Sequence, residues 1–231
     1  MKNYLKLSLT ALAFVLFFNC FAVTETRAQN VVNEILKRME AHRQSLSSLQ
    51  ANIKRDMYNP QTDEHDISEG TTMYLPAKGR DALVRIDWMK PLQETFSVVN
   101  KQYVIFQPRL KRAITGKVDD KNKNTKASGA LSFMSMSKEQ LKANYEVTYL
   151  GKETVGGNVE TWHLKLVPKT ASSQKYAEIW VDGNGMPLQG KVVENNDDST
   201  TVLLTNLQKN INLDASKFKI NLPKDTTIAK S

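Results

Sequence analysis

The sequence predicts a mainly β fold with some α-helix, in which a strongly curved antiparallel sheet forms an incomplete, half-open barrel. Three observations predict it. About ten short segments alternate apolar and polar residues, one early segment has helical periodicity, and one short apolar segment precedes a helix start. Successive strands joined by short turns are antiparallel neighbours. So many strands in one domain curl, and the helices then form a lid over the concave face and enclose an apolar cavity of the kind that binds lipids.

The first 28 residues have the pattern of a secretory signal peptide. Two lysines within the first six residues make a basic start, residues 7–18 are almost wholly apolar, and a short polar stretch follows. The apolar run is short for a transmembrane helix, so we predict cleavage after Ala28, with Ala22 as the second choice. Residues 29–231 then form a single domain of an exported protein.

Cys20 is the single cysteine of the chain and lies within the predicted signal peptide. Lipidation of this residue is an open alternative, although Phe17 and Asn19 match a lipidation signal poorly. After cleavage at Ala28 the chain has no cysteine. Disulfides, thiolate metal sites and a cysteine nucleophile would then be excluded.

The chain is basic, with a formal net charge of +8. The predicted signal peptide holds three basic residues and one acidic residue, so its removal leaves +6. An exported protein meets little nucleic acid, and the charge therefore favours anionic lipid headgroups or an acidic partner surface. The alternative is that the lysines only keep the protein soluble.

The first expected element is an amphipathic helix over residues 31–49. Its apolar positions recur every three or four residues and are Val32, Ile35, Leu36, Met39 and Leu46. Strands are expected next at 50–58 and 67–75, with a turn at 59–63 between them.

Residues 83–113 contain three consecutive strand-like runs joined by short turns. Each run alternates apolar and polar side chains, which places one set on each face of a sheet. We assign one apolar set to the acyl cavity: Val84, Ile86, Trp88, Phe96, Val98, Val104 and Phe106. The alternative is that these side chains form a dry, filled core.

A lysine-rich polar segment over residues 116–129 follows and should be a mobile loop. Arg109, Lys111 and Arg112 lie just before it, and together with Lys117 and the loop they predict a positive patch at one rim of the sheet. Such a patch can steer an acidic partner toward its docking site. The alternative is a solvated loop with no partner.

Residues 130–136 are apolar, and Ser137 with Gln140 forms the pattern of a capping box at the start of a second helix. Phe133, Met134 and Met136 are expected to close the cavity from the lid, because flexible methionines suit an adaptable apolar surface. An ordinary core helix is the alternative.

The rest of the chain again reads as strands. They are expected at 145–150, 160–167, 175–182, 187–194, 200–209 and, briefly, 218–222. Gly156-Gly157 and Asp182–Gly185 are hairpin turns, and the second lacks the further carboxylates of a calcium loop. Five apolar residues should lie opposite or beside the first cavity face: Trp162, Leu164, Leu166, Ile179 and Val181.

The sequence contains none of the local motifs that mark common enzymes or cofactor sites. The three histidines, His42, His65 and His163, form no pair at metal-ligand spacing. No GxSxG, P-loop or GxGxxG motif occurs. These observations favour a binding protein without a cofactor or metal over an enzyme.

Several sequence blocks occur in a characteristic order. They are LQANIKRDMYNP after the first helix, residues 74–76 with 84–88, VVNKQYVIFQP at 98–108, residues 175–189, and the closing NLQKNINLDASKFKINLP. Together they resemble the LolA-like family of periplasmic outer-membrane lipoprotein carriers over nearly all of the chain that follows the signal peptide.

The resemblance implies an unclosed antiparallel barrel with a helical lid over an apolar cavity. It also implies a monomeric periplasmic carrier of acylated lipoproteins. Such a carrier receives them from an inner-membrane lipoprotein-releasing transporter and hands them to an outer-membrane lipoprotein receptor. Similar folds occur in periplasmic sensors of lipoprotein stress and in glycolipid carriers, which are the alternative functions.

The chain departs from the family pattern at one position. The resemblance implies an arginine that latches the lid just before the proline that starts the third block, whereas here Leu75 precedes Pro76. Arg80 or Arg85 are the nearby residues that could replace it.

Overall fold

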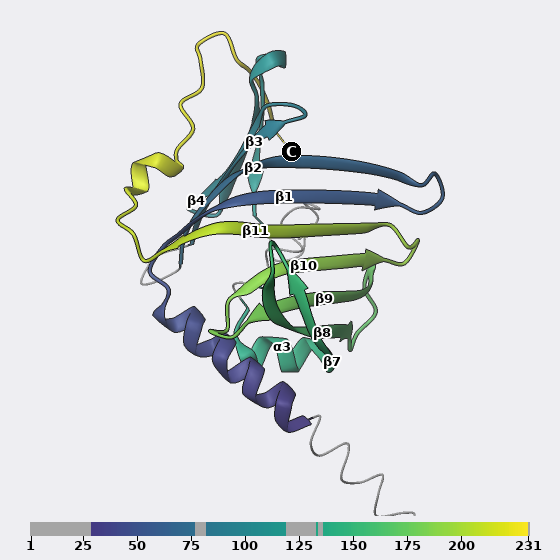
Figure 1. The fold of residues 1–231 in the computed structure, drawn as a ribbon. Coiled ribbons are helices and arrows are strands. Elements are labelled where there is room, and N and C mark those ends of the chain that lie inside the picture. Colours follow the sequence, from purple (N-terminus) through teal and green to yellow (C-terminus); the bar gives the residue numbers. More distant parts are fainter. Residues whose placement is uncertain (1–28, 77–81, 119–132, 134–135, 231) are drawn as a thin grey trace, which may run out of the picture.

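Twelve strands form one sheet that does not close on itself (Figure 1). The computed structural model describes residues 29–76, 82–118, 133 and 136–230. The strand order is β12-β6-β5-β4-β3-β2-β1-β11-β10-β9-β8-β7, so β12 and β7 are the two edges. All neighbours are antiparallel except β12 and β6, which are parallel. The predicted mainly β fold with an incomplete barrel is confirmed.

Most predicted strands are present, and several are longer than expected. The strands are β1 Leu49–Asn59, β2 Glu64–Leu75, β3 Leu83–Lys90, β4 Glu94–Val99, β5 Gln102–Gln107, β6 Arg112–Lys117, β7 Tyr145–Val155, β8 Val159–Pro168, β9 Gln174–Asp182, β10 Pro187–Glu194, β11 Ser199–Lys209 and β12 Thr227–Lys230.

Two parts of the strand prediction are wrong. Residues 112–117 form β6, although the sequence suggested that a loop begins at 116. Residues 218–222 are not a strand: Phe218 ends the 3-10 helix η2, Ala215–Phe218, whose first turn is capped by the Asp214 carboxylate accepting from Ser216 N. The last strand comes later, as β12 beside β6. Alternation over so few residues does not distinguish a strand from an extended segment with a turn.

The first helix spans residues 29–45 and has the predicted apolar stripe. All five stripe positions are buried: Val32, Ile35, Leu36, Met39 and Leu46. The helix ends before 49 because the chain turns toward β11, where Asn210 Oδ1 accepts from Ser47 N at 2.8 Å. The middle of this helix packs closely on the β9–β10 turn, since a Cβ on Gly185 would lie 2.3 Å from the Arg38 carbonyl oxygen.

The second helix, α3, spans Lys138–Asn144 and starts with the predicted capping box. Ser137 Oγ accepts from Gln140 N at 3.2 Å, and Gln140 Oε1 accepts from Ser137 N at 2.8 Å. In the described part of the chain, no helix is long and apolar enough to span a membrane.

The cross-strand register defines a concave and a convex face of the sheet. Residues opposite one another point to the same side, so the pairs Leu164–Ile179, Ile53–Leu204 and Ile86–Phe96 share one face. Both helices pack against this face in the main hydrophobic core, and it is therefore the concave face (Figure 1). A smaller cluster of Leu75, Leu83 and Phe218 lies on the convex face.

The end of the β7–β8 hairpin covers part of the convex face. Trp180 lies there opposite His163, and its ring stacks on that imidazole with centroids 4.2 Å apart. Trp180 Nε1 donates to Glu153 Oε2 of β7 at 2.8 Å, and Val155 is buried in the core. The β7–β8 hairpin thus covers part of the convex face, whereas the two helices cover part of the concave face.

Candidate functional site

The concave face has a filled part and a half-open part. Over β8 and β9 the side chains of Leu164, Leu166, Ile179 and Val181 are fully buried beneath the helices. Over β2 to β6, Ile86 and Trp88 of β3 are buried. The other apolar inward side chains there are only half-buried: Tyr74, Val84, Phe96, Val98, Tyr103, Ile105 and Ile114. This second group, which we call the apolar strip, is a surface of aliphatic and aromatic groups that the rest of the chain does not fully cover.

The structure brings most of the predicted cavity residues together on the concave face. They are Val84, Ile86, Trp88, Phe96, Val98, Trp162, Leu164, Leu166, Ile179 and Val181. Phe133 is buried in the same core with its ring 5.7 Å from that of Tyr145, and Met136 packs against that core. Met134 lies outside the described residues. A role of these side chains in binding an acyl chain stays a prediction.

Val104 and Phe106 are on the convex face, contrary to the placement expected from the sequence. The two-residue turn Asn100–Lys101, with both residues at positive φ, places Val98 opposite Tyr103 and Phe96 opposite Ile105. Because β5 carries apolar residues on both faces, its alternation does not reveal its phase relative to β4. Tyr103 and Ile105 take the concave positions.

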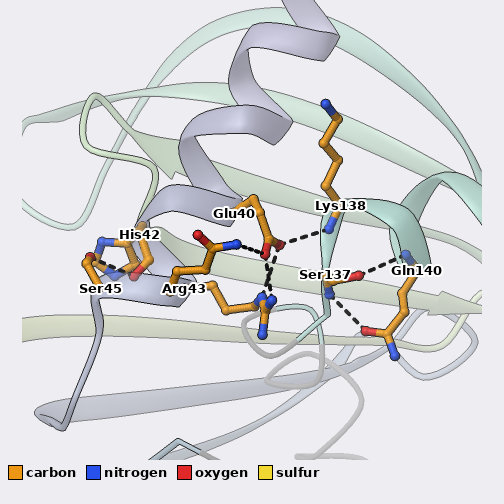
Figure 2. Close-up of polar contacts among 8 residues, drawn as sticks. Glu40, His42, Arg43, Ser45, Ser137, Lys138 and Gln140 are labelled. Carbon is orange, nitrogen blue, oxygen red and sulfur yellow. Dashed lines mark hydrogen bonds and ion pairs between the residues drawn. The ribbon is translucent and has the colours of Figure 1, made fainter. Parts of the chain in front are cut away.

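A carboxylate on the first helix joins the two helices that cover the concave face (Figure 2). Glu40 Oε2 accepts from Lys138 N, the first residue of α3, at 3.2 Å, and from Arg43 Nε at 3.0 Å. Its other oxygen accepts from Arg43 Nη2 at 2.6 Å and from Gln44 at 2.8 Å. The Arg43 hydrogen bonds and the Lys138 N–H lower the pKa of Glu40 to about 2. The carboxylate is therefore ionised near neutral pH.

Asn33 makes a second polar contact between the two helices, and His42 of the first helix is a half-buried polar side chain beside them. Lys142 Nζ of α3 donates to Asn33 Oδ1 at 2.5 Å, so the two helices are tied at two points. His42 is half-buried, and its Nε2 has no hydrogen-bond partner among the described residues. Burial and the nearby Lys209 charge lower the pKa of His42, so the ring is neutral near neutral pH.

Among the residues that the structure describes, the arginine that the resemblance placed near Pro76 has no counterpart that reaches the helices. Leu75 lies on the convex face against Leu83 and Phe218. Arg85 is also convex, where it forms a bidentate pair with Asp87 and donates to the Lys217 carbonyl oxygen at 2.8 Å. Arg80 lies outside the described residues. Glu40 and Asn33 thus provide the polar ties observed between the two helices. The signal for Glu40 in the sequence was only a pair of charges three residues apart on a helix.

Arg55 is a second residue of the concave face that the sequence reading overlooked. It follows Ala51 and Ile53 at the next inward position of β1, opposite Ser68. Its guanidinium lies 4.8 Å from the Trp88 ring centroid and donates to Ser68 Oγ at 2.9 Å. Nε of Arg55 is buried and has no hydrogen-bond partner in the described part of the chain. A cation therefore borders the apolar surface at its β1 end.

The predicted basic patch lies at the rim formed by the β5–β6 connection. Arg109 belongs to the 3-10 helix η1, Pro108–Leu110, and Lys111 and Arg112 follow it; all three are exposed. Lys111 Nζ is 2.6 Å from Asp225 Oδ2. Lys117 is at the opposite end of β6, beside Gln102, so the lysine-rich segment after it does not begin at this rim, contrary to expectation.

A pocket of about 420 Å³ lies at the tips of β1 and β2. The residues that line it include Tyr58, His65, Asp66 and Asp198. Over the residues that the structure describes, no three His, Cys, Asp or Glu side chains are placed to hold a metal ion.

Comparisons with known proteins agree with this fold. A family model described as "Outer membrane lipoprotein carrier protein LolA" matches residues 44–221. Among solved structures, an uncharacterized conserved protein from Thermus thermophilus superposes with a TM-score of 0.56 at 14% identity, over 86% of this chain and 98% of that one. A chain of the MucA/MucB complex of Pseudomonas aeruginosa gives a TM-score of 0.52 at 13% identity, over 82% of this chain and 61% of that one. No curated protein sequence matches significantly.

Proposed function

Because this chain belongs to the LolA family of outer membrane lipoprotein carrier proteins, we propose that it is a periplasmic carrier of acylated lipoproteins. In this proposal the acyl chains bind to the apolar strip of the concave face, beside the part that the two helices cover. The protein receives its cargo from an inner-membrane lipoprotein-releasing transporter and delivers it to the outer membrane. It acts by binding, as a monomer and without a cofactor.

The observation that carries the proposal is the half-buried apolar strip over β2 to β6. Aliphatic and aromatic side chains such as Val84, Phe96 and Ile105 stay partly exposed there, beside a core that is otherwise fully buried. Each methylene group that leaves water for such a surface contributes about 0.8 kcal/mol. Several methylenes of an acyl chain would therefore bind firmly, and they would cover a surface that is costly to leave in water.

A carrier must also release its cargo, and the contacts between the helices suit this requirement. The first helix and α3 are joined to each other through Glu40 and Asn33, so they can move as one lid. α3 has only seven residues and one fully buried side chain, Leu141, so few contacts hold it on the sheet. A lid of this kind can exchange between two positions when cargo binds or leaves.

The basic patch supports docking to an acidic surface during handover. Arg109 and Arg112 are exposed, and neither has a carboxylate partner among the described residues. Positive charge at one rim steers an acidic partner by long-range attraction and raises the rate of encounter. Reversible docking of this kind is what a transporter and a receptor both require.

The test is to purify the protein from the periplasm of its own cells under mild conditions and to identify co-purifying molecules by mass spectrometry. We expect acylated lipoproteins, and we expect their amount to fall when Phe96 is replaced by Glu. Recovery of a membrane-bound regulator without any lipid would contradict the carrier proposal and favour a sensor of the same fold. Recovery of glycolipid in place of lipoprotein would change the cargo.

A further inference from the structure

Three large apolar side chains are strongly exposed at the rim that carries the basic patch. Met89 is 55% exposed, Leu92 60% and Leu110 68%. Met89 is the penultimate residue of β3, Leu92 lies in the β3–β4 turn, and Leu110 ends η1. Exposed apolar side chains that gather at one place usually mark a site of interaction.

The strand register shows that these side chains belong to one rim. Thr95 at the start of β4 lies opposite Phe106 near the end of β5, so the β3–β4 turn and η1 are at the same end of adjacent strands. A hydrogen bond from Gln107 Nε2 to Glu94 Oε2, 2.9 Å long, joins the two connections. Figure 1 shows η1 beyond the ends of its strands at the top of the view, away from the helices.

Basic residues surround the three apolar side chains. Lys90, Arg109, Lys111 and Arg112 lie on the same two connections, and Lys224 is close by through the Lys111–Asp225 ion pair. Three acidic residues lie among these five basic ones, so two positive charges are in excess. Glu69 lies 3.7 Å from Lys90, Asp225 pairs with Lys111, and Glu94 accepts from Gln107. The rim is therefore apolar at its tips and positive around them.

We propose that this rim docks directly on an anionic lipid bilayer, with Met89, Leu92 and Leu110 inserted among the headgroups and the basic side chains against lipid phosphates. This inference rests on the proposed function and names the surface on which cargo is handed over. Interfacial binding requires apolar side chains flanked by cations, which is the composition of the rim.

The shape of the rim favours a bilayer over a protein partner. The apolar side chains are aliphatic and lie on separate protruding turns, whereas the centre of a protein interface is continuous and rich in aromatic residues. A bilayer accepts separate protruding side chains without a matching surface. The strip residues Val84, Phe96 and Ile105 lie on the strands that end at this rim, so a bound acyl chain has a short apolar route to the membrane.

The experiment mixes the protein, residues 29–231, with lipid vesicles, sediments the vesicles and measures how much protein is bound to them. Vesicles of phosphatidylethanolamine with phosphatidylglycerol supply an anionic surface, and phosphatidylcholine vesicles supply a neutral one. We expect binding to the anionic vesicles that weakens about tenfold in the triple variant Met89→Glu, Leu92→Glu, Leu110→Glu. The pair Arg109→Gln and Arg112→Gln should weaken binding to the anionic vesicles only.

The matched control is the triple variant Leu150→Glu, Val159→Glu, Val167→Glu, which adds the same charge at side chains that are 48%, 40% and 38% exposed on β7 and β8, far from the rim in strand order. This control should bind vesicles as the natural sequence does. Circular dichroism and binding of a fluorescent fatty acid check that each variant is folded and that its concave face is intact. Vesicle binding that is absent, or equal in the rim triple variant and the control, would overturn the membrane proposal. If the protein of natural sequence still binds the fatty acid when the membrane proposal fails, the carrier proposal stands. If the protein of natural sequence does not bind the fatty acid, the carrier proposal is contradicted.

Discussion

At the scale of single residues, the face on which an apolar side chain lies decides what a charged replacement does. Phe96 and Phe106 are both half-buried phenylalanines on neighbouring strands, yet they lie on opposite faces of the sheet. A glutamate on the concave face would bring a charge into the proposed acyl site, where its burial against an alkyl chain is unfavourable. On the convex face the same charge does not meet the cargo.

We therefore predict that Phe96→Glu weakens binding of a fluorescent fatty acid at least about tenfold, and that Phe106→Glu leaves it unchanged. Titration of the probe fluorescence measures the affinity, and circular dichroism verifies that both variants fold, since glutamate at a half-buried site can reach water. Equal loss of binding in the two variants would contradict the assignment of the strip as the acyl site.

The residues themselves also show what a sequence pattern can and cannot decide. The inward positions of β3, β8 and β9 follow from alternation, because polar residues such as Arg85, His163 and Glu178 interrupt the apolar residues on the other face of these strands. In β5, the run Tyr103 to Phe106 is apolar throughout, and only the turn geometry at Asn100 and Lys101 sets its phase. Arg55 was missed for a different reason: it interrupts an inward apolar series, and its contact with Trp88 is across two strands.

At the scale of elements, the tie between the two helices depends on the ionised Glu40. The Arg43 and Lys138 hydrogen bonds hold the pKa of Glu40 at about 2 in the folded protein, below its ordinary value of 4.5. A carboxyl with a lowered folded pKa binds fewer protons than in the unfolded chain, so its stabilisation is fully present above about pH 4.5 and is lost as the pH falls toward 2.

We predict that Glu40→Gln lowers the free energy of unfolding by about 2 kcal/mol at neutral pH. The difference from the natural sequence should shrink between pH 4.5 and pH 2, the interval between the two pKa values of Glu40. Urea unfolding followed by circular dichroism at several pH values measures it. Glu34→Gln is the control, because its ion pair with Arg38 is about half exposed and should matter little. A pH-independent difference would rule out the Glu40 carboxylate as the stabilising group.

The capping box at α3 gives a second prediction for an element. Ser137→Ala removes the side-chain acceptor for Gln140 N, and loss of such a cap costs about 1 kcal/mol. Thermal unfolding should show a lower midpoint, and hydrogen exchange should be faster in α3 than in the first helix. Ser45→Ala, at the exposed end of the first helix, is the comparison variant and should change both readouts little. Unchanged exchange in α3 would mean that packing of Leu141 alone holds the helix.

Elements with local signals were predictable, and those that depend on distant partners were not. The capping box of α3, the stripe of the first helix and the hairpin turns each reside in a few adjacent residues. β12 has only four residues, three of them exposed, and it exists because β6 offers a free edge more than a hundred residues earlier in the chain. Such a pairing leaves no periodic pattern for sequence reasoning to find.

At the scale of the whole molecule, the open sheet separates the two tasks of the proposed carrier. The lid helices and the buried part of the core lie over β8 to β11, while the basic and apolar rim is formed by the connections of β3 to β6. Cargo binding and docking thus depend on different residues. Changes at the rim should therefore alter the rate of handover without altering affinity for cargo.

Salt dependence of the handover tests this separation. Electrostatic steering by exposed charges is screened at physiological salt over about 8 Å, so we expect the rate of lipoprotein transfer to outer-membrane vesicles to fall as salt is raised. Joint replacement of Arg109, Lys111 and Arg112 by Gln should slow transfer similarly at low salt. Arg109 and Arg112 should account for most of the effect, because Lys111 is already paired with Asp225.

Lys117→Gln, at the other end of β6, carries the same charge change per residue and should leave the rate nearly unaltered. Fluorescent fatty-acid binding should be equal in all of these variants. Transfer rates that respond to neither salt nor the rim substitutions would mean that the patch serves only to keep the protein soluble.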